Sequence, residues 1–278
     1  MKLYIKLITL LTISLFISCE DVIDVEVQNA PERLVIEASL DWEKGTTGAN
    51  QTIKLSTSST YFVEDQSSPV TNATVKVTNT NTSEEFIFEN QNNGDYTITT
   101  FNPIIEDTYM LEVIYNNEVY TATENLKPVT DITRVEQSTE KGFDDEVLEV
   151  VAYFNDPEDE KNFYLFRFKE DGDLFYELEA GNDQFINGNE IDWWHEKDED
   201  DNQGEFTTGD RVELEMYGIS ETYYNYINTL IEQSEGVGLF GTTPVALKGN
   251  CINQTNANNY AHGFFRLTQV VKTNYTFE

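Results

Sequence analysis

The chain has 278 residues, of which 51 are Asp or Glu and 17 are Lys or Arg, and its net charge at pH 7 is −34. This charge argues against a nucleic-acid-binding protein, because affinity for phosphates comes largely from Lys and Arg. It also argues against docking on anionic lipids through a basic patch. The hydrophobic fraction of 39% is sufficient for one or two domains with packed cores.

The start of the chain has the features of a secretory signal. Two lysines precede an apolar run at 7–17, which is far shorter than the ~20 residues that a membrane-spanning helix needs. Ser18 and Cys19 follow this run and resemble a bacterial lipobox, although Phe16 stands where leucine is commonest. We therefore predict that residues 1–18 are a lipoprotein signal peptide and that Cys19 is lipidated. The alternative is an ordinary signal peptide.

Residues 19–31 form a lipidated acidic tether in this interpretation. The acidic residues behind Cys19, among them Glu20 and Asp21, resemble the surface-export signal of lipoproteins in the Bacteroidota. Several acyl chains hold a protein stably on a membrane, because each buried methylene contributes ~0.8 kcal/mol. We expect a protein that is lipid-anchored in the outer membrane and displayed at the cell surface. Cys251 is then the one remaining thiol, so no internal disulfide can form.

Short runs that alternate apolar and polar residues recur through residues 32–127. Such alternation, with turn residues between the runs, indicates strands, and Asn116-Asn117 is typical of a hairpin turn. Strands at this spacing over about a hundred residues predict an immunoglobulin-like β-sandwich. The runs are residues 33–40, 52–56, 73–78, 85–88, 96–99, 109–115 and 119–122.

A second β-rich region, 128–278, follows a connector at Pro128, because proline cannot continue a central strand. One helix is predicted near 220–233, where Ser220 can cap the first turn and apolar residues recur with helical spacing. These apolar residues are Tyr223, Ile227, Leu230 and Ile231, and the predicted strands are 146–154, 162–168, 174–178 and 263–271. The expected fold is mostly β, with an N-terminal immunoglobulin-like β-sandwich followed by a second β-rich section with one helix packed on it.

Several strand and turn motifs resemble a family of outer-membrane lipoproteins of the Bacteroidota, a domain of unknown function with the number four-two-four-nine. The motifs are Cys19–Asp24, Arg33–Glu37, Val70–Val77, Gly94–Tyr96, Phe154–Pro157, Asn162–Tyr164 and Gly263–Phe265. None of them carries catalytic chemistry. The resemblance implies a location and a partner, since such proteins are often encoded beside TonB-dependent outer-membrane receptors.

The most acidic stretch partly matches a calcium-binding loop. Counting from Asp198, oxygen ligands fall at the first, third and fifth positions, which are Asp198, Asp200 and Asn202. The match fails further on, because glycine comes one position late at Gly204 and Gly209 stands where a bidentate carboxylate belongs. We predict a solvated loop, with a calcium site as the alternative.

A second acidic stretch, around Asp156, Glu158 and Asp159, offers a weaker pattern of the same kind. A turn is the expected structure there.

Trp193 and Trp194 are adjacent and followed by His195. Neighbouring residues of a strand face opposite sides of the sheet, so one tryptophan is expected in the core while the other faces solvent. An exposed aromatic ring is a natural platform for a sugar ring or a partner protein. Trp193, Trp194 and Tyr217 are the residues that we predict for such a platform.

The sequence contains few signs of an enzyme. His195 and His262 have no metal-spaced partner, and neither a Gly-x-Ser-x-Gly elbow nor a phosphate-binding glycine loop is present. A thiol dyad of Cys251 with His262 has no local motif to mark it. We therefore expect a non-catalytic protein without a cofactor, calcium aside.

The predicted function is an accessory or binding subunit of a TonB-dependent transporter or another barrel complex. The alternatives are a stand-alone carbohydrate- or peptide-binding module and a surface structural or adhesion protein.

Overall fold

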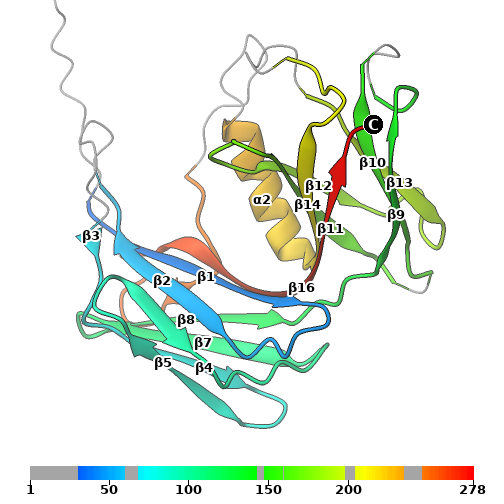
Figure 1. The fold of residues 1–278 in the computed structure, drawn as a ribbon. Coiled ribbons are helices and arrows are strands. Elements are labelled where there is room, and N and C mark those ends of the chain that lie inside the picture. The colour runs from blue at the N-terminus through cyan, green and yellow to red at the C-terminus, as the bar shows by residue number, and fades with distance from the viewer. Residues whose placement is uncertain (1–30, 60–67, 143–146, 159, 198–203, 235–245) are drawn as a thin grey trace, which may run out of the picture. The chain divides into compact units, whose positions relative to one another are not determined.

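The computed structural model describes residues 31–59, 68–142, 147–158, 160–197, 204–234 and 246–278 (Figure 1). The predicted lipidation residue Cys19 and the predicted calcium ligands Asp198, Asp200 and Asn202 lie outside the described residues. Glu32–Glu278 form one compact unit. Within the described ranges α2 (Glu221–Ser234) is the only helix, and no helix there is long and apolar enough to cross a membrane.

Strands make up most of the described structure, which confirms the predicted mostly β fold. Where one face of a sheet meets solvent the side chains alternate, as in β4, whose Val75 and Val77 are buried on either side of Lys76. The strands are β1 (Leu34–Glu43), β2 (Gln51–Thr57), β3 (Ser68–Pro69), β4 (Thr74–Asn79), β5 (Glu85–Asn90), β6 (Asp95–Ile98), β7 (Thr108–Tyr115), β8 (Glu118–Asn125), β9 (Ile132–Ser138), β10 (Glu149–Asn155), β11 (Phe163–Glu170), β12 (Glu177–Asn182), β13 (Glu190–His195), β14 (Arg211–Ile219), β15 (Ile252–Asn253) and β16 (His262–Thr276).

Two β layers packed face to face form the first β-sandwich, as predicted. One layer has the order β16-β1-β2-β6, with the short β3 on β2, and the other has the order β5-β4-β7-β8-β15. The layers are continuous at one edge, where β5 pairs with β6. Apolar side chains such as Ile36, Val77 and Tyr96 fill the space between them. Asn116 and Asn117 have positive φ angles of 50° and 64°, so the predicted β7–β8 hairpin turn is confirmed.

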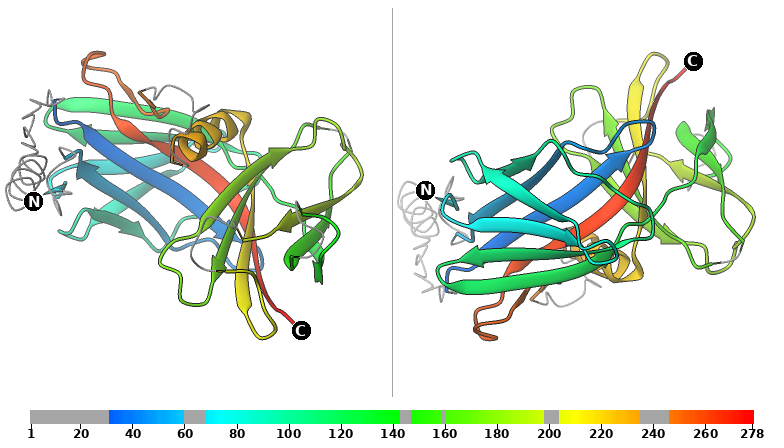
Figure 2. Two further views of the ribbon diagram at one scale, coloured as in Figure 1. Left: turned by 90° about the horizontal axis from the view of Figure 1, so that it is seen from above. Right: turned by 90° about the horizontal axis from the view of Figure 1, so that it is seen from below.

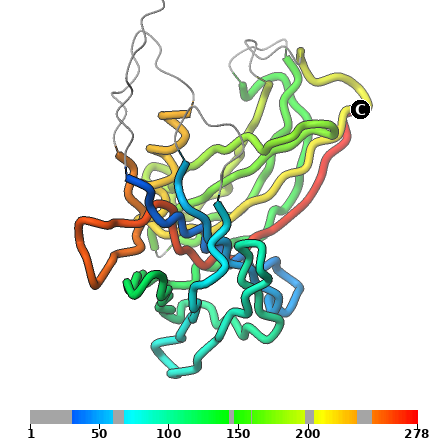
Figure 3. Tube along the Cα trace, turned by 90° about the vertical axis from the view of Figure 1, so that its left-hand side faces the viewer, coloured from blue at the N-terminus to red at the C-terminus, as the bar shows by residue number. Residues whose placement is uncertain are grey.

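The last strand, β16, joins this sandwich to the rest of the chain. Its residues His262–Val270 pair in parallel with Val35–Glu43 of β1, and its residues Val270–Thr276 pair antiparallel with β14. Figure 2 shows β16 in red beside β1 in blue, and Figure 3 shows its end running along β14. A parallel pair requires a long connection, and here that connection includes almost every other element.

The residues after the connector form a second β-sandwich. Its first sheet has the order β12-β11-β14-β16, and its second sheet has the order β13-β10-β9. Aromatic side chains are prominent in the core between them, where the ring centroids of Phe154 and Phe166 lie 5.8 Å apart. The sequence analysis did not predict β9, because its mostly polar residues show no buried run.

The helix α2 covers the other face of the β12-β11-β14-β16 sheet, as predicted (Figure 1). Ser220 caps its first turn, since Tyr223 N donates a hydrogen bond to Ser220 Oγ at 3.1 Å. Tyr223 and Ile227 are buried against Phe264 of β16. Leu230 was predicted to share this buried stripe, but it is 41% exposed, whereas the next residue, Ile231, packs against the same core.

The domain boundary predicted at residue 127 does not separate the two sandwiches cleanly, because C-terminal strands return to the first one. β15 and the first half of β16 pair with strands of the first sandwich, although they come from the region 128–278. The connector is itself fixed to β16, because Lys127 N donates to Leu267 O at 3.2 Å and Gln269 N donates to Lys127 O at 2.8 Å. Hydrogen-bonded backbone therefore joins the two sandwiches.

A buried ion pair lies where β1 and β16 run side by side. Arg266 Nη1 is 2.8 Å from Asp41 Oδ1, and the two side chains are 7% and 30% exposed. The Arg266 guanidinium also lies 5.1 Å from the ring centroids of Tyr217 on β14 and Tyr223 on α2. One cation thus contacts elements of both sandwiches.

Arg266→Ala is expected to lower the free energy of unfolding by about 2–4 kcal/mol, because it leaves the Asp41 carboxylate without its partner in a partly buried place. Urea unfolding measures the change. Lys54→Ala is the control, since the Lys54–Glu37 pair is 3.9 Å apart and more than half exposed, and a loss below about 1 kcal/mol is expected there. Equal losses in the two variants would contradict a special role for the buried pair.

Candidate functional site

Trp193 of β13 belongs to the core of the second sandwich. Its ring stacks on Phe166, with centroids 4.3 Å apart and planes 15° apart. Its Nε1 donates to Glu179 Oε2 at 2.6 Å, and a Cβ at Gly181 would collide with the indole. The partly buried indole is therefore held in place by packing against the core and by a hydrogen bond.

Trp194 faces the other side of the β13-β10-β9 sheet. It pairs with Val151 of β10 and is half-buried. The expectation that the two tryptophans face opposite sides agrees with this register. Of the three predicted platform residues, Trp194 is the one outside a packed core.

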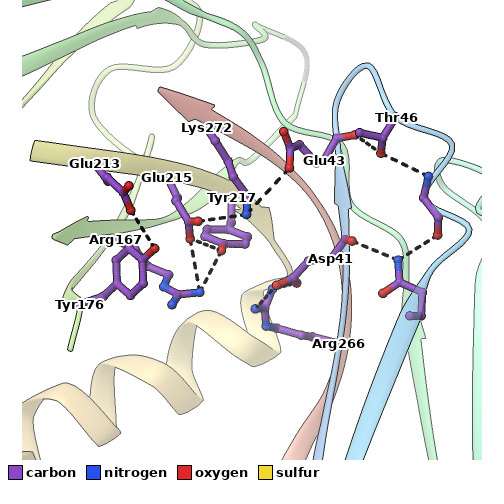
Figure 4. A network of polar contacts seen from close by, with 12 residues as sticks. Asp41, Glu43, Thr46, Arg167, Tyr176, Glu213, Glu215, Tyr217, Arg266 and Lys272 are labelled. Atoms are coloured by element: carbon purple, nitrogen blue, oxygen red, sulfur yellow. Dashed lines mark hydrogen bonds and ion pairs between the residues drawn. The ribbon is translucent and has the colours of Figure 1, made fainter. Parts of the chain in front are cut away.

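Tyr217 is 1% exposed, so its assignment to a surface platform is corrected here. Its hydroxyl donates to Glu215 Oε2 at 2.5 Å and accepts from Arg167 Nη1 at 3.0 Å (Figure 4). Lys272 Nζ lies 3.1 Å from Glu215 Oε1. Burial raises the pKa of Tyr217, which keeps the phenol neutral. These contacts explain how a polar ring can be buried between the sheet and α2.

His195 is buried at the end of β13, between two carboxylates of β12. Its Nδ1 lies 2.7 Å from Glu179 Oε1, and its Nε2 lies 3.4 Å from Glu177 Oε2. Its ring stacks on Phe168 with centroids 4.1 Å apart. The carboxylates and the stacking orient the ring as part of the core.

A small polar cavity opens beside His195. Even with the adjoining open solvent included, its empty volume is only about 230 Å³, which is below the range of typical small-molecule sites. Lys197 Nζ lies 2.5 Å from Glu170 Oε2 and 4.7 Å from the ring centroid of Phe206, so this ammonium group is already paired within the lining. The lining consists of Phe168, Lys169, Glu170, Asp173, Glu177, His195, Lys197, Phe206 and Val212.

Leu174 and Phe175, which we call the apolar tip, lie in the β11–β12 turn at the rim of this cavity. They are 84% and 83% exposed, and they stand in the chain between Asp173 and Glu177, which line the cavity. The prediction of a strand at 174–178 is wrong for these two residues, because β12 begins only at Glu177. Two large apolar residues directly after Asp-Gly-Asp, itself a turn signal, could have indicated an exposed tip.

A second exposed apolar position lies at the opposite end of the same strands. Phe185 follows β12 and is 91% exposed. In the β11–β12 pair, Phe163 is opposite Asn182 and Phe168 is opposite Glu177, so the apolar tip and Phe185 belong to different ends. They form two separate surfaces.

The weaker acidic candidate around Asp156 is a structural turn. Tyr164 Oη donates to Asp156 Oδ1 at 2.5 Å, and Gly188 N donates to Asp156 Oδ2 at 2.9 Å. Both carboxylate oxygens are thus engaged in holding loops together. Glu158 is exposed, and Asp159 lies outside the described residues. Among the residues that the structure describes, no group of three or more His, Cys, Asp or Glu could hold a metal ion.

The described residues thus define a protein of two β-sandwiches joined by one strand, with an exposed apolar tip on the second. The chain belongs to the family described as Domain of unknown function (DUF4249), whose model matches residues 20–274. The family resemblance that the motifs indicated is confirmed by this match.

Two solved structures show similarity at low sequence identity. A DUF4785 family protein from Legionella pneumophila subsp. pneumophila str. Philadelphia 1 is 10% identical, with a TM-score of 0.27, over 66% of this chain and 52% of that chain. The FN1–FN3 domains of chicken CNTN1 are 11% identical, with a TM-score of 0.26, over 70% of this chain and 64% of that chain. The matched region is therefore less than two thirds of either structure. No curated protein matches the chain.

Trp193→Ala is expected to lower the free energy of unfolding by about 2–4 kcal/mol, because it empties a packed site beside Phe166. Trp194→Ala should cost less, about 1 kcal/mol, since the side chain lies outside this core. Chemical unfolding followed by circular dichroism measures both. A larger loss for Trp194→Ala would contradict the assignment of Trp193 to the core.

Burial raises the pKa of the Cys251 thiol to about 12, so the reactive thiolate is scarce at pH 8. In a Cys19→Ser chain, Ellman's reagent is expected to leave Cys251 unmodified at pH 8 until denaturant is added. Rapid modification of the folded protein would show that the thiol is accessible, and it would reopen the dyad with His262.

Proposed function

We propose that this protein is a surface-exposed, outer-membrane lipoprotein that acts as a non-catalytic accessory or binding subunit of a TonB-dependent transporter or another barrel complex. The apolar tip is the observation that carries the proposal. Monomeric soluble proteins rarely present neighbouring large apolar side chains to water without a binding role. Leu174 and Phe175 are both more than four fifths exposed.

The surroundings of the apolar tip support a protein partner in preference to a small molecule. The adjacent cavity is small, and the Lys197 ammonium group that lines it is already paired with Glu170. An apolar centre with a polar rim is the usual composition of a protein–protein interface. A net charge of −34 would steer a partner with basic loops toward this surface.

The predicted lipid anchor supplies the membrane location in this proposal. Cys19→Ser should move the protein from the membrane fraction to the soluble fraction after cell lysis. Incorporation of labelled fatty acid into the wild type, and its loss in the variant, measures the lipid directly. Labelling that persists in Cys19→Ser would contradict attachment at this residue.

Docking is tested by affinity purification of the tagged protein from detergent-solubilised outer membranes of the producing bacterium. We expect a barrel protein to copurify with the wild type. A Leu174→Glu/Phe175→Glu double variant should reduce its recovery at least tenfold, because interface apolar anchors typically contribute 1–2 kcal/mol each or more.

Ile87→Glu is the matched control. Ile87 is an apolar residue that is 63% exposed on β5 of the first sandwich, and its replacement should leave recovery unchanged. Recovery of no barrel protein with the wild type would overturn the proposed function. Equal recovery with the tip variant would reject the apolar tip as the docking surface.

A further inference from the structure

Two glutamates face each other at the end of the β10–β13 ladder. Val150 of β10 is paired with His195 of β13, and the antiparallel register therefore brings Glu149 opposite Glu196. Like charges directly opposite each other destabilise a sheet.

Glu149 is 0% exposed although it is a carboxylate. Its Oε1 accepts a hydrogen bond from Lys141 N at 2.6 Å, whereas its Oε2 is buried without any hydrogen-bond partner. The ammonium group of Lys141 is engaged elsewhere, 2.6 Å from Asp192 Oδ2. Among the described residues no cation forms an ion pair with Glu149. Burial of a charged oxygen without a partner costs several kcal/mol.

Gly142 shows where the two carboxylates converge. A Cβ built at Gly142 would collide with carboxylate oxygens of both Glu149 and Glu196. The two carboxylates therefore point at the same small space beside the Gly142 backbone, and a larger residue at this position would have to displace them. The unpartnered Oε2 of Glu149 is one of the oxygens at this space.

We infer that Glu149 and Glu196 bind a divalent cation of the calcium class at this space. A hard cation prefers carboxylate oxygens, and Ca²⁺ tolerates the irregular ligand sets that Mg²⁺ rejects. It would offset the repulsion across the ladder and supply the missing partner of Glu149 Oε2. With two carboxylates, and with water and backbone carbonyls as further ligands, the expected dissociation constant is roughly 10⁻⁴–10⁻³ M, typical of extracellular modules.

This site is distinct from the calcium loop predicted from sequence at Asp198, Asp200 and Asn202, which lies outside the described residues. It is also independent of the proposed docking function, because neither residue of the apolar tip takes part in it.

The test compares thermal unfolding of the full-length, detergent-solubilised protein in 5 mM Ca²⁺ and in EGTA. The wild type should melt about 5 °C higher in Ca²⁺, since a ligand that binds only the folded state raises its stability. Glu149→Gln and Glu196→Gln should each melt at the same temperature in both buffers. Glu140→Gln, an exposed residue of the neighbouring turn, should keep the full response.

Direct binding provides a second measurement that does not depend on stability. Equilibrium dialysis with radioactive Ca²⁺ should give about one bound ion for the wild type, and at least tenfold weaker binding for Glu196→Gln. This variant keeps the buried Glu149, so it remains informative if Glu149→Gln fails to fold.

Three results would overturn the inference. The first is an identical melting temperature of the wild type in Ca²⁺ and in EGTA. The second is a Ca²⁺ response that both glutamine variants retain, which would place the ion elsewhere in the chain. The third is a higher melting temperature of Glu149→Gln in EGTA together with no Ca²⁺ binding by the wild type, which would show that the two carboxyl groups share a proton.

Discussion

The backbone pairing of β16 with β1 and β14 is the constraint on which both sandwiches depend. The first half of β16 completes a sheet of the N-terminal sandwich, and the second half completes a sheet of the following one. Neither sandwich has all its strands until the end of the chain has been added. Because the paired residues of β1 and β16 are more than 200 positions apart in the sequence, we expect slow folding with a large loop-closure cost. An isolated 32–127 fragment would expose the edge of β1.

Local patterns in the sequence were enough to predict most of the individual strands and the helix. Alternation identified β4 and β7, Asn116-Asn117 identified a hairpin, and Ser220 identified the start of α2. The parallel pairing of β16 could not be predicted, since hydrophobic periodicity carries no information about which distant strand is the partner. β14 and β16 are buried on both faces. A sandwich core covers one face, and α2 covers the other.

The candidate site was less accessible to sequence reasoning than the fold. Tyr217 looked suitable for a surface because it is polar and aromatic, but Arg167 and Glu215 satisfy its hydroxyl in the interior. The residues of the apolar tip belong to a run of large side chains that resembles a strand, yet β12 begins only at Glu177. Burial of Glu149 could not be predicted from a chain with 51 acidic residues, in which nearly every acid is expected at the surface.

The direction of β1 sets how far the start of the folded unit lies from the junction of the two sandwiches. The chain enters at Leu34, and β1 runs about 33 Å to the junction at Glu43, at 3.3 Å per residue. Beyond the junction, Tyr275 near the end of β16 is opposite Val212, which is opposite Glu170 just before the apolar tip. Leu34 and the apolar tip therefore lie at opposite ends of the path that β1 and β16 make through the folded unit.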